Sequence, residues 1–182
     1  MGLPRTRSPL GPDDKQASPV DDLDIEDLFR RYAPNVASMG LAMLGQRDEV
    51  DDLVQDVFLR AWRGMKRLED AGAVKSWLMT IAVRVARTRL ARRRFTRLFL
   101  PTGEVNVEEI AAPETSPEER VTLQRLYRIL QRMPVDLRIA WVLRHVQSET
   151  VEEVARLCGW SLSTAKRRIA DAEKRVGKKL SR

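Results

Sequence analysis

The sequence is poor in the residues that most often carry chemistry. It contains one cysteine, Cys158, and one histidine, His145, among 182 residues. A single thiol cannot close an intramolecular disulfide, and one cysteine with one histidine is too few for a zinc site or a paired acid/base site. We therefore expect no metal, no cofactor and no thiol chemistry, and we interpret His145 as a partly buried neutral side chain.

Aromatic residues, glycine and long apolar segments are also scarce. Aromatic residues make up 5% of the chain, there are 9 glycines, and no long run alternates as a strand would. No apolar run reaches the roughly 18 residues that span a bilayer, and the opening MGLPRTRSPLGPDD lacks the apolar centre of a signal peptide. We expect an all-α protein of the cytoplasm without membrane insertion.

Positive charge is abundant, and it comes in blocks. The formal net charge is +7, with eight basic and no acidic residues in 71–103, then six acidic and no basic residues in 104–119. Residues 120–182 are basic again. Two basic segments separated by an acidic one indicate two contacts with a polyanion rather than one diffuse basic surface.

The same segments divide the chain into expected domains. Residues 1–22 are rich in proline and have little to bury, which predicts a disordered tail. Residues 23–97 and 120–182 each carry helical apolar patterns and predict two small helical bundles. Residues 98–119, with prolines and acidic charge, predict a flexible linker between them.

One helical pattern, DEVDDLVQDVFLRAWRGM, combines a wide apolar face with an isolated leucine. The apolar face, which we expect in the core, consists of Leu53, Val54, Val57, Phe58, Ala61, Trp62 and Met65. Leu59 falls on the opposite side. The polar residues expected around it are Asp52, Gln55, Asp56, Arg60 and Arg63. An isolated exposed leucine is common, so this pattern fits either an ordinary surface or the centre of a protein docking patch.

The next pattern predicts a helix with a basic ridge. Within 74–97 the apolar stripe is opposed by residues spaced three and four apart, namely Thr80, Arg84, Arg87, Ala91 and Arg94. Most charged runs are simply solvated faces. Because no acidic residue neutralises this one, a phosphate backbone is the favoured partner.

A turn between two helical patterns follows in TVEEVARLCGWSLSTAKRRIADAEKRV. Gly159 can end one helix in the left-handed conformation, and Ser161 can start the next by accepting the backbone N–H of Ser163 or Thr164. Thr150 and Glu153 have the spacing of a capping box. The arrangement is typical of a helix-turn-helix, whose second helix enters the major groove.

The second helix of this motif begins with small residues and continues with basic ones. We expect Ser163 to let the backbone approach phosphate, and Lys166 and Arg167 to reach guanine O6 and N7. Thr164 and Arg168 lie to the side and are expected to touch phosphate. A plain αα-hairpin is the alternative, but the basic outer face favours DNA.

Three stretches together resemble a known family. They are DEVDDLVQDVFLRAWRGM, KSWLMTIAVRVARTRLARRR and, after the acidic segment, LRIAWVLRHVQSETVEEVARLCGWSLSTAKRRIADAEKRV. In this order and spacing they resemble the two-domain sigma factors of bacterial RNA polymerase, the extracytoplasmic function (ECF) group. The resemblance implies that 23–97 is sigma region 2, that 120–182 is sigma region 4, and that the protein has no catalysis of its own.

The resemblance implies three sites. The first would dock on the β′ clamp helices of the polymerase through Asp52, Gln55, Asp56, Leu59, Arg60 and Arg63. The second would open and hold the promoter near −10 through Lys75, Thr80, Arg84, Arg87, Thr88 and Arg94. The third would read the −35 element through Ser163, Thr164, Lys166, Arg167, Arg168 and Lys174.

The implied partners are RNA polymerase core, through its β′ clamp helices and β flap, promoter DNA, and an anti-sigma factor. A free-standing helix-turn-helix regulator is the main alternative. It would use residues 23–97 as a sensor or dimerisation domain and bind DNA without polymerase. A basic helix lying on an anionic membrane ranks last, because its apolar stripe is needed inside the bundle.

Overall fold

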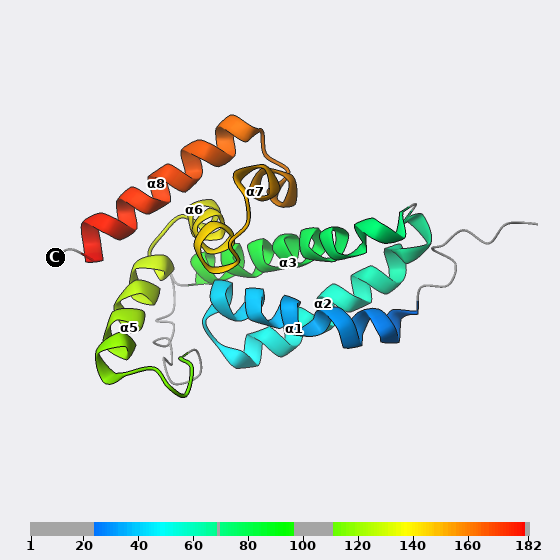
Figure 1. The fold of residues 1–182 in the computed structure, drawn as a ribbon, viewed down its shortest axis with the longest axis horizontal. Helices are drawn as coiled ribbons and strands as arrows, with labels where there is room; N and C mark the ends of the chain where they lie inside the picture. The colour runs from blue at the N-terminus through cyan, green and yellow to red at the C-terminus, as the bar shows by residue number, and fades with distance from the viewer. Residues whose placement is uncertain (1–23, 69, 97–110, 181–182) are drawn as a thin grey trace, which may run out of the picture.

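The computed structural model describes residues 24–68, 70–96 and 111–180, and all regular structure within these ranges is helical (Figure 1). The all-α fold predicted from the sequence is therefore confirmed. The expected tail over 1–22 lies outside the described residues. Among the described helices, none combines the length and apolar character that crossing a bilayer requires.

The first bundle contains three long helices. These are α1 (Ile25–Leu44), α2 (Arg47–Gly64) and α3 (Val74–Thr96), with the short 3₁₀ turns η1 (Met65–Arg67) and η2 (Ala71–Ala73) between α2 and α3. Each of the three long helices contacts the other two. Their apolar faces therefore share one interior.

The ends of α1 follow from local residues. The side chain of Asp24 caps its start by accepting the backbone N–H of Glu26 at 3.2 Å. Gly45, with φ 74°, ends it in the left-handed conformation, where a side chain would be strained. Pro34 lies inside α1, which continues past it to Leu44.

The second bundle is formed by the elements that follow in the chain. They are α5 (Pro117–Gln131), α6 (Val135–Trp141), the π-helical turn η3 (Val142–Val146), α7 (Val151–Cys158) and α8 (Leu162–Leu180). Helix α8 contacts each of the α-helices α5, α6 and α7. It therefore holds this bundle together along its length (Figure 1).

Helix α5 begins inside the range expected to be linker. Ser116 and Glu119 form a reciprocal capping box, which also lowers the pKa of the Glu119 carboxyl, and Pro117 occupies the first turn. Residues 117–119 are therefore helical. Proline and acidic residues are typical of a helix start, but they are also typical of a linker, and the prediction followed the composition of the whole segment. Residues 98–110 of the expected linker lie outside the described residues.

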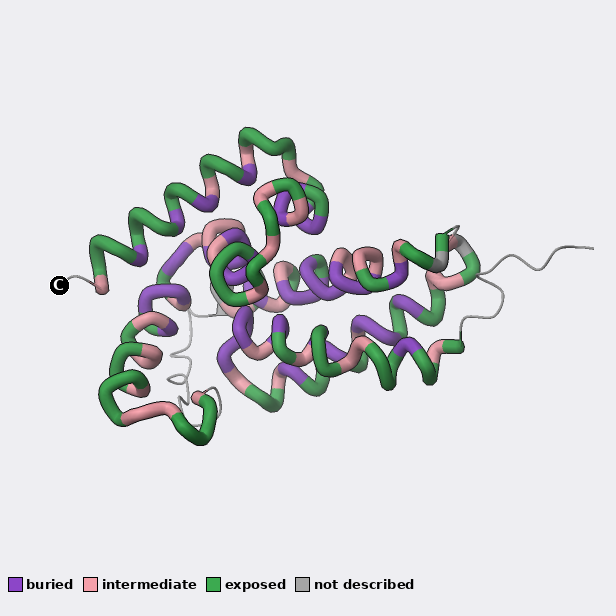
Figure 2. The backbone as a smooth tube through the Cα atoms, in the orientation of Figure 1, coloured by how far each residue is buried: buried purple, intermediate pink, exposed green. Residues whose placement is uncertain are grey.

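The two bundles pack against each other along α3. This helix contacts α6 and α7, and α1 contacts η3. Buried side chains of both bundles belong to one cluster, which Figure 2 shows as purple segments facing the interior. One side of α3 therefore lies under the second bundle, although the sequence indicated two independent units.

Candidate functional site

Leu59 lies on the solvent side of α2 with 44% of its surface exposed, as the sequence pattern predicts. Four of the polar residues expected around it are exposed as well, namely Asp52, Gln55, Arg60 and Arg63. Asp56 differs, because its Oδ2 accepts a hydrogen bond from Arg89 of α3. Its carboxylate therefore holds α2 to α3 in addition to bordering this surface.

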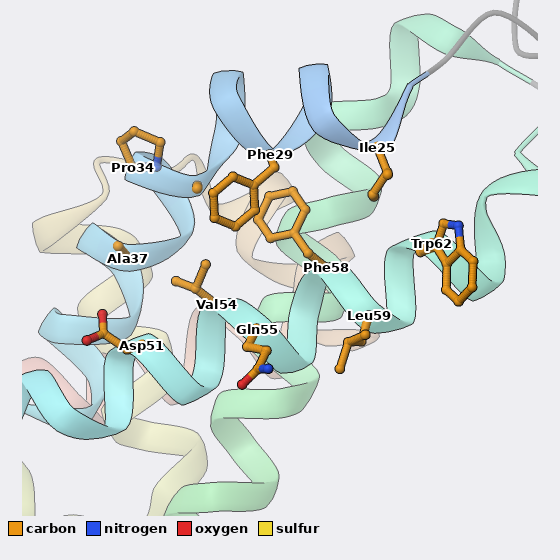
Figure 3. A pocket seen from close by; sticks show the side chains of 11 residues that line it. Ile25, Phe29, Pro34, Ala37, Asp51, Val54, Gln55, Phe58, Leu59 and Trp62 are labelled. Atoms are coloured by element: carbon orange, nitrogen blue, oxygen red, sulfur yellow. The ribbon is translucent and has the colours of Figure 1, made fainter.

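Leu59 also lines an apolar groove between α1 and α2, with a volume of about 790 Å³ (Figure 3). The rings of Phe29 and Phe58 meet edge to face there, with centroids 4.9 Å apart. Trp62, expected in the core, is 61% exposed and lines the groove instead. It follows Leu59 by three residues and is therefore its neighbour on the helix surface, which is the signal that could have indicated its place.

The exposed part of α3 offers cations and hydroxyl groups. Lys75, Arg84 and Thr88 face solvent, and Thr80 is half-buried. The hydroxyls of Thr80 and Thr88 each donate to the carbonyl four residues earlier, at 2.9 and 3.0 Å. Their oxygens therefore remain available as acceptors. The side chain of Arg94 lies outside what the structure describes.

Arg87 was expected on the same solvent-facing ridge, but it points to the second bundle. Its NH1 donates to the Cys158 carbonyl at 3.4 Å, and its Nε lies 3.3 Å from Oδ1 of Asp136. Its guanidinium also lies 5.2 Å from the centroid of the Trp160 ring. Arg87 is half-buried rather than exposed, because α6 and α7 pack over this side of α3, and its expected contact with the −10 DNA stays a prediction.

Arg168 of α8 joins the same group. Its NH2 lies 2.9 Å from Oδ2 of Asp136, and its guanidinium lies 4.1 Å from the centroid of the Trp160 ring. With 26% of its side chain exposed, Arg168 is held inside its own bundle rather than presented to phosphate. We call Arg87, Asp136, Trp160 and Arg168 the Arg87 clasp.

Charges of the first bundle also affect carboxyl groups of the second. The exposed Lys75 of α3 acts on the pKa values of Glu149 and Glu153 through its charge. The pKa of Glu149 is raised, because burial and repulsion from Glu153 outweigh the attraction of Lys75. The pKa of Glu153 is lowered, mainly because Arg156 donates to it, with Lys75 adding to the effect. The charge of Lys75, which was expected to contact DNA, thus acts to lower the pKa of both carboxyls.

Two further arginines of the basic segment stabilise the first bundle. Arg89 pairs with α2, as described above. Arg93 donates to Glu49 Oε1 at 2.6 Å, to the Leu44 carbonyl at 2.8 Å and to Gln46 Oε1 at 2.7 Å. Sequence reasoning missed these roles. The available signal was spacing, because Arg89 and Arg93 are four residues apart and so share a face of α3 that differs from that of Arg84.

The helix-turn-helix is formed by α7, α8 and the turn between them. Thr150 caps α7 by accepting the backbone N–H of Glu153 at 3.1 Å, and Gly159 ends the helix with φ 67°. Ser161 caps α8 by accepting the backbone N–H of Thr164 at 3.2 Å. The predictions for Gly159 and Ser161 are confirmed. Of the capping box predicted for Thr150 and Glu153, the structure shows the hydrogen bond to the Thr150 side chain, whereas the Glu153 carboxylate accepts from Arg156 Nε at 2.8 Å.

Helix α8 alternates along its length between buried residues, which turn to the bundle, and exposed residues on its outer side (Figure 2). The inner face is buried and consists of Ala165, Ile169, Ala172 and Val176. The outer face includes the exposed residues Ser163, Lys166, Arg167 and Lys174. Thr164 is half-buried, and its hydroxyl accepts from that of Ser161 at 2.8 Å. The N-terminal half of the outer face is therefore free to meet a polyanion.

The remaining candidate groups for chemistry are engaged or protonated. Burial raises the pKa of Cys158 to about 12, so its thiol is not ionised near neutral pH. His145, expected to be partly buried, is exposed, and its Nε2 lies 3.0 Å from Oε1 of Glu173. Within the described ranges, no group of three or more potential metal ligands occurs.

Both bundles match models of a known family. Residues 28–96 match sigma-70 region 2, and residues 123–176 match sigma-70 region 4. The first match covers the three long helices of the first bundle, and the second covers most of the second bundle, including the helix-turn-helix. The two matches together cover more than half of the chain, in the order in which the regions were expected.

Relatives similar along most of their length point to the same family. The chain is 34% identical over 144 residues to the RNA polymerase sigma factor CarQ of Myxococcus xanthus, covering 79% of this chain and 81% of the relative. It is 30% identical over 156 residues to the ECF RNA polymerase sigma factor SigM of Mycobacterium tuberculosis, covering 85% of this chain and 76% of the relative.

The fold is also shared with a solved sigma factor. The sigma factor RpoE of Bartonella quintana, solved in complex with the anti-sigma factor NepR, superposes with a TM-score of 0.67 at 23% identity. The match covers 87% of this chain and 97% of that chain. On the family matches and the relatives, the chain belongs to the sigma-70 family, as a sigma factor of the extracytoplasmic function group that directs RNA polymerase to promoters.

Proposed function

We propose that the α2 surface centred on Leu59 docks on the clamp helices of the polymerase β′ subunit. The observation that carries this proposal is the exposure of Leu59 beside an apolar groove, with polar residues around it. An apolar centre with a charged rim is the usual anatomy of a docking patch. In the rim we include Asp52, Gln55, Asp56, Arg60 and Arg63.

The exposed face of α3 is proposed to hold the melted promoter strand near −10. Arg84 supplies a cation for the phosphate backbone, and the hydroxyl oxygens of Thr80 and Thr88 can accept hydrogen bonds from base amines. We assign Lys75 and Arg94 to the same strand as further phosphate contacts. Arg87 takes part only when it leaves the second bundle.

The outer face of α8 is proposed to read the −35 element in the major groove. Lys166 and Arg167 are exposed near the N-terminal end of the helix, where a recognition helix contacts base edges. Ser163, Thr164 and Lys174 contact the flanking phosphates. Arg168 orients the helix through Asp136, and the second bundle contacts the β flap.

The decisive experiment combines a pull-down with transcription. The purified chain is mixed with RNA polymerase core, captured, and assayed for transcription from promoters of the organism. We expect capture of the core and initiation that depends on the chain. The alternative, a free-standing helix-turn-helix regulator, predicts sequence-specific DNA binding without polymerase and no capture of the core.

We also propose that an anti-sigma factor restrains this protein in the cytoplasm, and that the protein catalyses no reaction itself. Support comes from the Bartonella quintana structure, in which a sigma factor of the same fold is bound to an anti-sigma factor. The groove between α1 and α2 is the apolar surface that such a partner would cover. Co-purification of this chain with the product of an adjacent gene tests the assignment.

A further inference from the structure

We propose that the N-terminal segment, residues 1–23, binds the apolar groove between α1 and α2 of its own chain, and that a docking partner must displace it. The second half of this statement rests on the function proposed above, since displacement matters only if a partner docks at the groove. The free protein then carries its own ligand for this surface. The affinity that a partner achieves depends on how firmly the segment is held.

The groove is an apolar surface that the described residues leave uncovered. Its lining includes Phe29, Leu59 and Trp62, and all three side chains are exposed. Figure 3 shows the rings of Phe29 and Phe58 close together within the groove, with Trp62 towards one end. Soluble monomers seldom expose contiguous apolar patches unless a ligand or partner uses them. Aromatic rings along a groove are also the usual receptor for proline-rich segments.

The N-terminal segment has the composition that such grooves bind. Four of its 23 residues are proline, namely Pro4, Pro9, Pro12 and Pro19. Proline-rich chain favours the extended polyproline II conformation before it binds, so docking it on aromatic rings costs less conformational entropy than ordering other sequences. The stretch PLGP, residues 9–12, also carries a leucine between its prolines. This stretch is the part expected to lie against the aromatic rings.

The chain enters the fold at one end of the groove. Ile25, the first residue of α1, lines the groove on the same side as Trp62, and Ala37 and Asp51 line the opposite end (Figure 3). From Ile25 to Ala37 the helix rises about 18 Å, at about 1.5 Å per residue. Polyproline II covers about 3 Å per residue, so about six residues span this length. The segment is therefore long enough to turn back and follow the whole groove.

The charges of the segment and of the groove are complementary in this direction. The first twelve residues have two arginines and no acid, whereas the next ten have four aspartates and one lysine. Apart from Arg47 at its start, α2 has the exposed acids Asp51 and Asp52 in its first half, and the exposed bases Arg63 and Lys66 follow Trp62. A segment that runs back along the groove places its arginines at the acidic end and its aspartates at the basic end.

Tethering makes a weak interaction sufficient. Because the segment is joined to α1 beside the groove, its local concentration there is on the order of millimolar, as for other short linkers. A segment with an intrinsic Kd of about 1 mM therefore occupies the groove in half or more of the molecules. The apparent affinity of a partner is reduced by the fraction of molecules whose groove is open. Occupation of this kind tunes docking without preventing it.

The test uses the full chain with a spin label at Ser8→Cys, in a Cys158→Ala background so that the label reacts at one position. The indole N–H signal of Trp62 in NMR spectra, assigned by substitution, reports the groove. The label should remove most of its intensity and leave that of Trp160, which packs against α3, unchanged. The matched control is a label at Lys178→Cys on α8, which should leave the Trp62 signal intact. An intact Trp62 signal with the label at Ser8→Cys overturns the proposal.

Charge reversal tests the direction of the segment. Arg5→Glu with Arg7→Glu should restore the indole signal in the groove, because these residues then meet Asp51 with like charge. Adding Asp51→Arg should remove the signal again. Lys178→Glu with Lys179→Glu changes the net charge by the same amount on α8 and should restore nothing. A signal that stays weak after reversal of both arginines contradicts the proposed arrangement.

Dilution identifies the occupant of the groove. A segment bound within its own chain gives the same loss of signal at every protein concentration, whereas binding between two copies weakens on dilution. The loss of the Trp62 signal should therefore persist in dilute samples. A loss that disappears on dilution assigns the groove to a second copy of the chain, and the proposal is then wrong.

Polymerase capture separates this proposal from the proposed function. Arg5→Glu with Arg7→Glu should bind polymerase core about two- to fivefold more tightly than the unmodified chain, because more molecules have an open groove. If neither protein is captured, the proposed docking function fails, and the NMR signals still decide where the segment binds. If both bind equally while the Trp62 signal reports an occupied groove, docking stands and the proposed displacement is wrong.

Discussion

At the scale of single residues, Leu59 is an apolar side chain of α2 that does not pack inside the bundle. We predict that Leu59→Asp abolishes capture of RNA polymerase core, because a desolvated charge at the centre of an interface is costly. Thermal unfolding of the free protein should hardly change, since the side chain is already 44% exposed. Pull-down and thermal unfolding are measured on the same preparation.

The control is Val121→Asp on α5, which places the same charge at another exposed apolar residue. It should retain capture. If Leu59→Asp is captured normally, the docking surface lies elsewhere on the molecule.

Lys166 and Arg167 are the residues expected to distinguish base sequences. Alanine at either position should cost about 1–3 kcal/mol of binding to the cognate −35 element and relax the preference at one or two base pairs. Lys178→Ala, at the far end of the same helix, should weaken binding evenly across sequences. Selection from randomised −35 elements, transcribed with each variant, gives the preferences. An unaltered preference in both variants contradicts base reading.

Side chains whose environment is local were predictable, and those with distant partners were not. The exposure of Leu59 follows from the periodicity of one helix. The burial of Arg87 depends on α6 and α7, which are remote in the sequence, and nothing in the arginine pattern indicates them. Arg93 is similar, because its partners are the last residue of α1, Gln46 in the turn that follows and Glu49 in the first turn of α2. The segment has no acidic residue of its own, but in the folded protein Arg87, Arg89 and Arg93 pair with carboxylates of other elements.

At the scale of elements, the turn between α7 and α8 depends on the left-handed conformation of Gly159. Gly159→Ala should destabilise the protein by about 1 kcal/mol, because alanine is strained at this φ. No atom lies within 4 Å of an added Cβ, so crowding adds nothing. Gly177→Ala, inside α8 and equally uncrowded, should stabilise by about 0.5–1 kcal/mol. Chemical denaturation measures both, and equal signs would contradict the conformational explanation.

Some arginines of helix α3 stabilise the fold and others are exposed, and substitutions should distinguish the two groups. Arg93→Ala should lower the free energy of unfolding by about 1–3 kcal/mol, because it leaves Glu49 and Gln46 without their partner. Arg84→Ala should leave stability unchanged and reduce promoter opening, since Arg84 is exposed. Denaturation and permanganate reactivity near −10 report the two effects. A stable Arg93→Ala variant with impaired opening would reverse the two assignments.

Element boundaries were predictable where a cap marks them. Gly159 defines a boundary through its left-handed backbone and Ser161 through its side-chain cap, and the structure has both. The start of α5 was missed because its capping residues lie in a segment whose prolines and acids are also typical of linkers. Capping residues therefore predicted the turn of the helix-turn-helix correctly, whereas composition placed the start of the second bundle three residues too late.

At the scale of the whole molecule, two buried groups make stability sensitive to alkaline pH. Burial raises the pKa of Tyr127 from 10.0 to about 12 and that of Cys158 from 9.0 to about 12. The folded protein therefore holds these protons more tightly than the unfolded chain. Stability should be unaffected by either group below about pH 9 and should fall as pH rises towards about 12.

Urea unfolding measured across this range checks the prediction, with Cys158→Ala as the comparison. This variant lacks the thiol, so its loss of stability should begin at higher pH, where Tyr127 alone contributes. Parallel curves for the two proteins would show that the thiol does not contribute.

The contact between the bundles has a consequence for how the protein responds to dilution. Because Arg87 and Asp136 belong to one chain, their contact forms within a single molecule and does not depend on protein concentration. Binding of a separate partner, in contrast, rises with the concentration of that partner. Dilution therefore weakens the binding of a partner but leaves the contact between the bundles unchanged.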